Sequence, residues 1–132
     1  MNGLRPTFTC FDDAIEFLVK SQPIQRELVQ VVHALCLGDQ GELFAHGWVE
    51  DMCNALVWQG GIADGVKIFY GVPIDWFYQN FAPQKLKRYR LDEIIKQINC
   101  GPWDPEIEAF ADPGKCIHKW LTNVPAKSVV RL

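Results

Sequence analysis

The sequence predicts a single α+β domain, in which an N-terminal helix packs on a short antiparallel β-meander and helices fill the C-terminal half. The chain has 132 residues, the usual size of one domain. Apolar residues make up 48% of it and include five Trp and eight Phe, which is enough for a core. Short strand-like segments fill the first half and helix-like segments the second. We expect one domain over residues 1–132, with its core at 9–121 and a flexible tail at 122–132.

The first helix is predicted from Thr9 to Ser21, because Ala14, Phe17 and Leu18 share one helical face and Thr9 can cap the start. Three strands then follow, separated by turn residues. They are predicted at Leu28–Leu37, Glu42–Glu50 and Ala55–Gln59. Because the connections are short, we expect these strands to pair in chain order, all antiparallel.

The glycine-rich segment Gly60–Gly65 is predicted to be a loop, and Val66–Tyr70 a fourth strand. Pro73 is expected at the first position of a helix that ends at Phe81. The basic run Lys85–Arg90 is typical of a protected edge strand. Further helices are predicted at Leu91–Ile98, Pro105–Ala111 (capped by Asp104) and Ile117–Leu121, and poor order from Pro125 on.

The charge balance argues against two classes of partner. Charged residues make up 22% of the chain and the net charge is -3, so no basic surface for nucleic acid or for anionic membranes is expected. No apolar run reaches the ~20 residues that span a bilayer. The first six residues lack the layout of a secretory signal, so we expect a cytoplasmic protein.

The cysteine pattern is irregular. There are five, at positions 10, 36, 53, 100 and 116, with no C-x-x-C pair. Such spacing predicts reduced thiols without disulfides and no zinc site of the usual kind.

The strand around His46 carries the first candidate group. By alternation Phe44, His46, Trp48 and Glu50 point to one face, while Leu43, Ala45 and Val49 point to the other. An imidazole among aromatic rings can have a pKa suited to a general base. The alternative is a core histidine that bonds a backbone carbonyl.

Cys10 is the second candidate, because it lies in the first turn of the predicted helix. A helix N-terminus favours the thiolate, which is the reactive form. Asp12 and Asp13 in the same turn oppose this effect. The alternative is a buried structural cysteine beside Phe11.

The order of these residues resembles the papain-like superfamily in its broad sense, which includes the transglutaminase-like proteins. The similarity covers about residues 9–70: Cys10 with Phe11-Asp12-Asp13-Ala14, and His46-Gly47-Trp48-Val49-Glu50, which is similar to the H-[AG]-W-V-E strand of such proteins. The resemblance implies that Cys10 is the nucleophile and His46 its base.

The third residue departs from the family pattern. Transglutaminase-like proteins usually carry an Asp on the next strand, where this chain has Val57-Trp58-Gln59. Gln59 can orient the imidazole but cannot stabilise its charged form as a carboxylate does. Asn54 and Asp64 are the substitutes to be considered.

Two functions follow from these patterns. The first is a thiol-dependent hydrolase or acyl-transfer enzyme that acts on an amide or peptide bond through Cys10, His46 and Gln59, with a peptide or protein as substrate and no cofactor. The second is a non-catalytic binding or assembly domain of the same fold, using the aromatic segment Trp76–Phe81 and the basic edge Arg88–Arg90.

Overall fold

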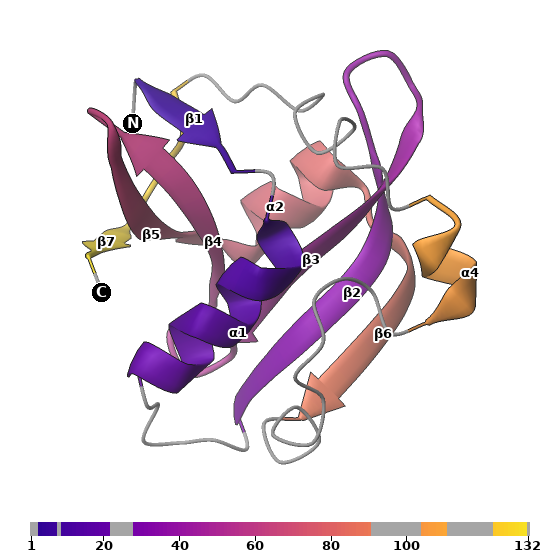
Figure 1. Cartoon of the computed structure of the whole chain (residues 1–132), viewed down its shortest axis with the longest axis horizontal. Coiled ribbons are helices and arrows are strands. Elements are labelled where there is room, and N and C mark those ends of the chain that lie inside the picture. Colours follow the sequence, from indigo (N-terminus) through magenta and orange to yellow (C-terminus); the bar gives the residue numbers. More distant parts are fainter. Residues whose placement is uncertain (1–2, 8, 22–27, 91–103, 111–122, 132) are drawn as a thin grey trace.

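A seven-stranded antiparallel sheet forms most of the computed structural model, which describes residues 3–7, 9–21, 28–90, 104–110 and 123–131 (Figure 1). Helices α1 and α2 flank the sheet. In chain order the elements are β1 (Leu4–Pro6), α1 (Cys10–Ser21), β2 (Val29–Leu37), β3 (Leu43–Asp51), β4 (Leu56–Ala63), β5 (Val66–Pro73), α2 (Ile74–Phe81), β6 (Gln84–Arg90), α4 (Pro105–Glu108) and β7 (Ser128–Val130).

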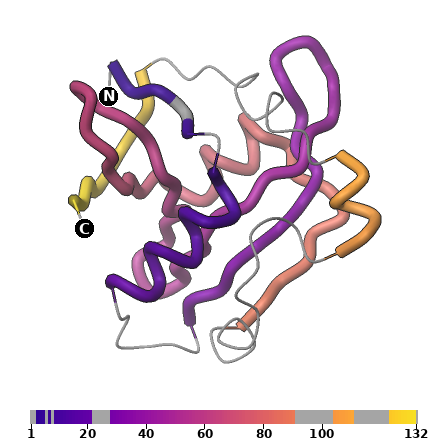
Figure 2. Tube along the Cα trace, viewed as in Figure 1, coloured from indigo at the N-terminus to yellow at the C-terminus, as the bar shows by residue number. Residues whose placement is uncertain are grey.

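The strands lie in the order β6-β2-β3-β4-β5-β7, and β1 pairs with β4 beside this path. The predicted order and antiparallel pairing of the three meander strands are therefore confirmed. The basic strand β6 lies at one end of the sheet, as predicted for an edge, and can be followed next to β2 in Figure 2.

The predicted fold class is wrong, because the sheet is much larger than a short meander and the C-terminal half is not mainly helical. Of the described C-terminal residues, Gln84–Arg90 and Ser128–Val130 are strands and α4 has only four residues. The last strand pairs with β5, although we expected a flexible tail there. The helices predicted at Leu91–Ile98 and Ile117–Leu121 lie outside the described residues.

The glycine-rich segment is also not a loop. Gly60 to Ala63 continue β4, and only Asp64 and Gly65 form the turn to β5. Both turn residues have positive φ, 50° and 75°, as a two-residue hairpin turn requires. Its glycine content predicted a loop because glycine weakens strands. Glycine also occurs within strands where other groups approach the backbone closely, as in β4.

Strands β3 and β4 pair over only three positions, Val49 to Asp51 opposite Leu56 to Trp58. Beyond Trp58 the two strands separate, and the far end of β4 pairs with β1 instead. We call this opening the β3–β4 split. His46 and Gln59 lie beside it, on β3 and β4.

The two main helices cover opposite faces of the sheet. On α1, Ala14, Phe17 and Leu18 pack with a cluster that includes Val49 and Trp58. On α2, Phe77 and Phe81 pack with a second cluster, which includes Phe44 and Trp48. In Figure 1, α1 accordingly crosses in front of β3 while α2 lies behind. The alternation predicted for β3 is confirmed.

Gly47 and Gly60 leave room for the first turn of α1 to pack against the sheet at the split. A Cβ atom on Gly47 would lie 2.7 Å from the Phe11 ring, and one on Gly60 would lie 2.2 Å from a carboxylate oxygen of Asp13. Real Cβ atoms do not approach other atoms so closely, so the helix can lie at this depth only because both positions lack a side chain.

We expect Gly60→Ala to destabilise the fold by about 2 kcal/mol, because overpacking a filled site typically costs 1–3 kcal/mol. Asp13 cannot move aside, since it is buried and held by several partners. Urea unfolding would measure the loss. Gly38→Ala is the control, because its new Cβ would meet only the carboxylate end of Glu42, which can turn into solvent. Equal losses in the two variants would contradict this reading of the split.

Candidate active site

His46 lies in a cage of aromatic rings. Its imidazole is nearly parallel to the Phe81 ring, with centroids 5.4 Å apart and an interplanar angle of 10°. Further ring contacts come from Phe44 and Trp48 on β3 and from Phe77 on α2. The cage forms because strand alternation puts residues 44, 46 and 48 on one face, and because Phe77 and Phe81 are four residues apart on α2.

A short hydrogen-bonded chain holds the imidazole across the split. His46 Nε2 lies 2.5 Å from Gln59 Oε1, and the Gln59 amide donates to the Tyr70 hydroxyl oxygen at 3.2 Å. The Gln59 oxygen therefore accepts from Nε2–H, and in the neutral ring the lone pair is on Nδ1. Nδ1 is buried and has no hydrogen-bond partner among the described residues.

Burial lowers the pKa of His46 from 6.5 to about 4, because the apolar cage disfavours a charged ring. The hydrogen bond that Nε2–H donates to the Gln59 oxygen and the negative charge of Asp13 both raise the pKa of His46, but their effects are smaller than that of burial. At neutral pH His46 is therefore an uncharged imidazole with a basic nitrogen, Nδ1, available in a site that excludes most water.

Cys10 begins α1, and its side chain is buried. It lies on the same helical face as Asp13, Ala14 and Phe17, which all point to the sheet. The sequence interpretation of a thiol enzyme places the start of α1 on the face of Phe44, His46 and Trp48. Instead, the apolar side of α1 covers the opposite face, and its first turn contacts Gly47 and Gly60 at the split. No hydrogen bond joins the Cys10 thiol to His46 Nδ1.

Of the candidates for the third site residue, Gln59 is the one beside His46. Asn54 lies in the β3–β4 turn, where its amide donates to Asp51 at 2.8 Å. Asp64 is a turn residue between β4 and β5 with φ 50°. Neither substitute is in the site.

Sequence reasoning missed two residues of this site. Tyr70 lies directly opposite Gln59 in the β4–β5 ladder, so the hairpin register would have revealed it. Asp13 lies on the buried side of α1, three residues after Cys10, and helical spacing alone would have placed it on that side. From the sequence alone, Asp13 is only a charge that opposes a thiolate at Cys10.

A second polar cluster surrounds Glu50, which is 3% exposed. Its carboxylate accepts hydrogen bonds from the Trp48 indole, the Tyr78 hydroxyl and the Arg88 guanidinium. The cluster borders an open cavity of about 410 Å³, lined by Gln30, Glu50, Met52, Ile74, Tyr78 and Arg88. Of the aromatic segment Trp76–Phe81 that the binding-domain hypothesis uses, Phe77 and Phe81 are buried.

The described part of the chain can also be searched for disulfides, metal-binding clusters and membrane-spanning helices. Cys10, Cys36 and Cys53 form no disulfide there, while Cys100 and Cys116 lie outside it. In the same part, no cluster of three or more His, Cys, Asp or Glu side chains is arranged to hold a metal ion. Its helices are too short and too polar to cross a bilayer.

Comparisons with protein-family models, with curated proteins and with solved structures find no match for this chain. The papain-like resemblance therefore depends on the quoted residues alone.

We expect the fold to lose stability as the pH falls from 6.5 toward 4. Burial lowers the pKa of His46 to about 4 and that of His33 to about 3. Between these values and 6.5 the unfolded chain binds protons that the folded chain does not, so acid favours unfolding. Each histidine contributes about 1.4 kcal/mol per pH unit below 6.5, which predicts a loss of about 4 kcal/mol between pH 7 and pH 5.

Urea unfolding at the two pH values measures this loss. In His33→Leu the difference between the two should fall by about half. A free energy of unfolding that is the same at pH 7 and pH 5 would contradict the burial of both rings.

We expect Arg88→Met to lower the free energy of unfolding by about 2 kcal/mol, because it leaves the buried Glu50 carboxylate without its cation. The loss is smaller than for a fully buried pair, since the Arg88 side chain is 42% exposed. Thermal or urea unfolding would measure it. Lys87→Met on the same strand removes only a surface pair with Asp104 at 3.4 Å, so its cost should be much smaller than that of Arg88→Met. Equal effects of the two variants would refute the assigned role of Glu50.

Proposed function

We propose that this chain is a thiol-dependent hydrolase or acyl-transfer enzyme that acts on an amide or peptide bond, with Cys10 as nucleophile, His46 as base and Gln59 as the residue that orients the base. One observation carries the proposal. A neutral imidazole is held by Gln59 at Nε2 while its basic Nδ1 is buried and unbonded among the described residues. A histidine kept only for packing would be expected to use both nitrogens.

The chemistry would proceed in two steps. His46 Nδ1 removes the thiol proton of Cys10, and the thiolate attacks the substrate carbonyl carbon. Backbone N–H groups in the first turn of α1 stabilise the oxyanion that forms. The tetrahedral intermediate then expels the amine, which takes its proton from His46, and leaves an acyl group on Cys10. Water, or a second amine in the case of acyl transfer, releases this group with His46 again as base.

The geometry sets a condition on this proposal. The Cys10 thiol must reach Nδ1 through the β3–β4 split, which the first turn of α1 contacts at Gly47 and Gly60. Catalytic hydrogen bonds are often longer before substrate binds, so a small movement of the first turn is part of the proposal. The proposal also includes a cytoplasmic location, because Cys10 must stay reduced to react.

The second candidate function is a non-catalytic binding domain. The open cavity beside Glu50, Tyr78 and Arg88 favours it, since it combines apolar walls with polar groups that can orient a bound peptide or protein. The two functions differ in what they require of Cys10, because a binding domain needs no activated thiol.

Alkylation with iodoacetamide tests the enzyme proposal. An ordinary thiol of pKa about 8.5 reacts roughly 100-fold more slowly at pH 6 than at pH 8.5, because so little thiolate remains. We expect the rate at Cys10 to fall less than about tenfold over this range, because the proposal requires an ion pair between the Cys10 thiolate and a protonated His46. The adjacent thiolate would raise the pKa of His46 above the value of about 4 that burial gives the ring. Mass spectrometry of the alkylated peptides measures each cysteine separately.

The exposed Cys53 is the internal reference, and the ratio of rates cancels the difference in accessibility. In His46→Ala, Cys10 should acquire the pH profile of Cys53. If both cysteines follow the same profile in the unmodified protein and in the variant, the enzyme proposal is wrong and the binding domain takes its place.

A further inference from the structure

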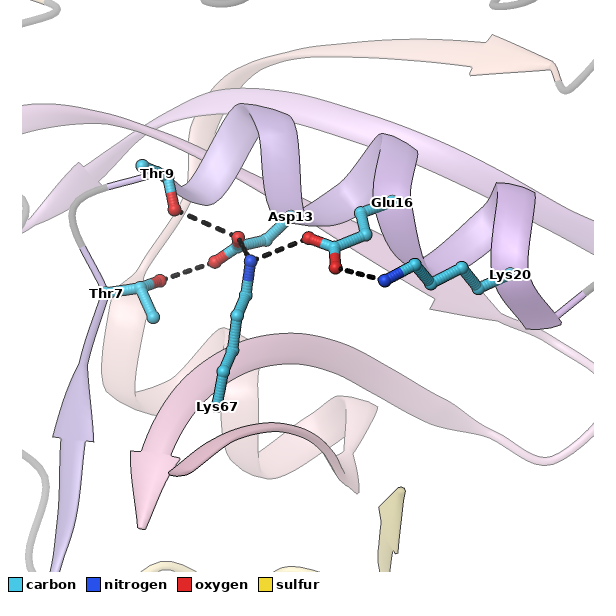
Figure 3. A network of polar contacts seen from close by, with 6 residues as sticks. All are labelled: Thr7, Thr9, Asp13, Glu16, Lys20 and Lys67. Atoms are coloured by element: carbon cyan, nitrogen blue, oxygen red, sulfur yellow. Dashed lines mark hydrogen bonds and ion pairs between the residues drawn. The ribbon is translucent and has the colours of Figure 1, made fainter. Parts of the chain in front are cut away.

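Asp13 is a buried carboxylate with an unusually complete set of partners (Figure 3). Only 2% of it is exposed. The hydroxyl groups of Thr7 and Thr9 donate to its two oxygens at 2.5 and 2.9 Å, and Lys67 forms an ion pair with it at 2.7 Å. These partners satisfy both oxygens of the buried side chain.

The ion pair continues toward solvent. Lys67 on β5 also contacts Glu16 at 2.7 Å, and Glu16 contacts Lys20 at 2.9 Å (Figure 3). Burial lowers the pKa of Lys67, but the carboxylates of Asp13 and Glu16 outweigh it and raise that pKa, so the ammonium stays charged. The first two turns of α1 are thereby attached to β5.

Asp13 also lies at the β3–β4 split. A Cβ on Gly60 would lie 2.2 Å from its carboxylate, and Gly60 follows Gln59, the residue that holds His46. Burial has the largest effect on the pKa of His46 and of Tyr70, and the negative charge of Asp13 raises both pKa values as a smaller contribution. Gln59 is an amide and carries no charge with which to do so.

We propose that Asp13 is a positioning residue of the candidate site, which holds the first turn of α1 at the β3–β4 split and supplies the negative charge, facing a protonated His46, that Gln59 lacks. This inference rests on the proposed function. Transfer of the Cys10 proton to Nδ1 places a positive charge in an apolar cage, and a fixed negative charge nearby lowers the cost of that step.

Other titratable groups face His46 as well. Burial lowers the pKa of His33 on β2, and the nearby His46 lowers it further. Tyr70 on β5 stays a neutral phenol because burial raises its pKa. Among the described groups that act on His46, Asp13 is the one that favours the imidazolium by its charge.

Asp13→Asn tests the inference, because the amide keeps nearly the same shape and removes the charge. The readout is the NMR titration of the His46 ring from pH 7 down to about pH 2, a range that includes both expected midpoints and does not depend on any reaction of Cys10. In the unmodified protein we expect a midpoint at about 4. In Asp13→Asn we expect it to fall by about one pH unit, since a charge without direct contact has less effect than a contacting one.

Glu16→Gln is the matched control. It removes the other carboxylate bound to Lys67 and should leave the His46 midpoint unchanged. If Asp13→Asn does not fold, as judged by circular dichroism, Lys67→Met serves instead. There the uncompensated Asp13 charge should raise the midpoint. An unchanged His46 midpoint in the folded Asp13 variant, or no rise in the Lys67 variant, overturns the inference.

This outcome can be separated from the fate of the proposed function. If the alkylation of Cys10 proves independent of His46, the enzyme proposal fails, while the titration still decides whether Asp13 acts on His46. If the enzyme proposal and the inference about Asp13 are both correct, Asp13→Asn should also steepen the fall in the rate of Cys10 alkylation between pH 8.5 and pH 6.

Discussion

The hydrogen bond between His46 and Gln59 joins two strands where their backbone ladder has ended. Strands β3 and β4 pair over only three positions, and beyond Trp58 this side-chain bond spans the opening. The rest of the site depends on that opening. The first turn of α1 reaches the sheet here because Gly47 and Gly60 have no side chains, and the aromatic cage closes over the ring from the other face.

Neutral polar groups lie on one side of this opening and ion pairs lie on the other. The inner side is neutral: burial and aromatic rings keep His46 uncharged, and Tyr70 stays a phenol. The outer side is ionic, with Asp13 neutralised by Lys67 and Glu16 by Lys20. A neutral base next to a compensated negative charge suits a proton transfer that creates charge briefly. The Glu50 cluster stabilises the same face of β3 four residues further on, by joining it to α2 and β6.

Several parts of this arrangement could be predicted because their signals are local. Strand alternation put His46 with Phe44 and Trp48, and short turns set the order of β2, β3 and β4. The fold class was wrong because distant pairing decides it. Strand β1 pairs with β4, and β7 with β5 across more than fifty residues of sequence, where neither short segment has a pattern of its own. The glycines of β4 were assigned to a loop because composition records their flexibility and not the close contacts that they allow.

The sequence by itself determined which groups are available: a cysteine at a helix start, a histidine among aromatic residues, and an amide on the next strand. Each of these groups can be recognised from the residues next to it in the sequence, because helix starts and strand alternation depend on local spacing. Only the tertiary structure decided that Gln59, and not Asn54 or Asp64, bonds His46, because that choice depends on the register where β3 and β4 separate. It also decided that Asp13 lies buried beside this bond, since only packing brings α1, β4 and β5 together at one point.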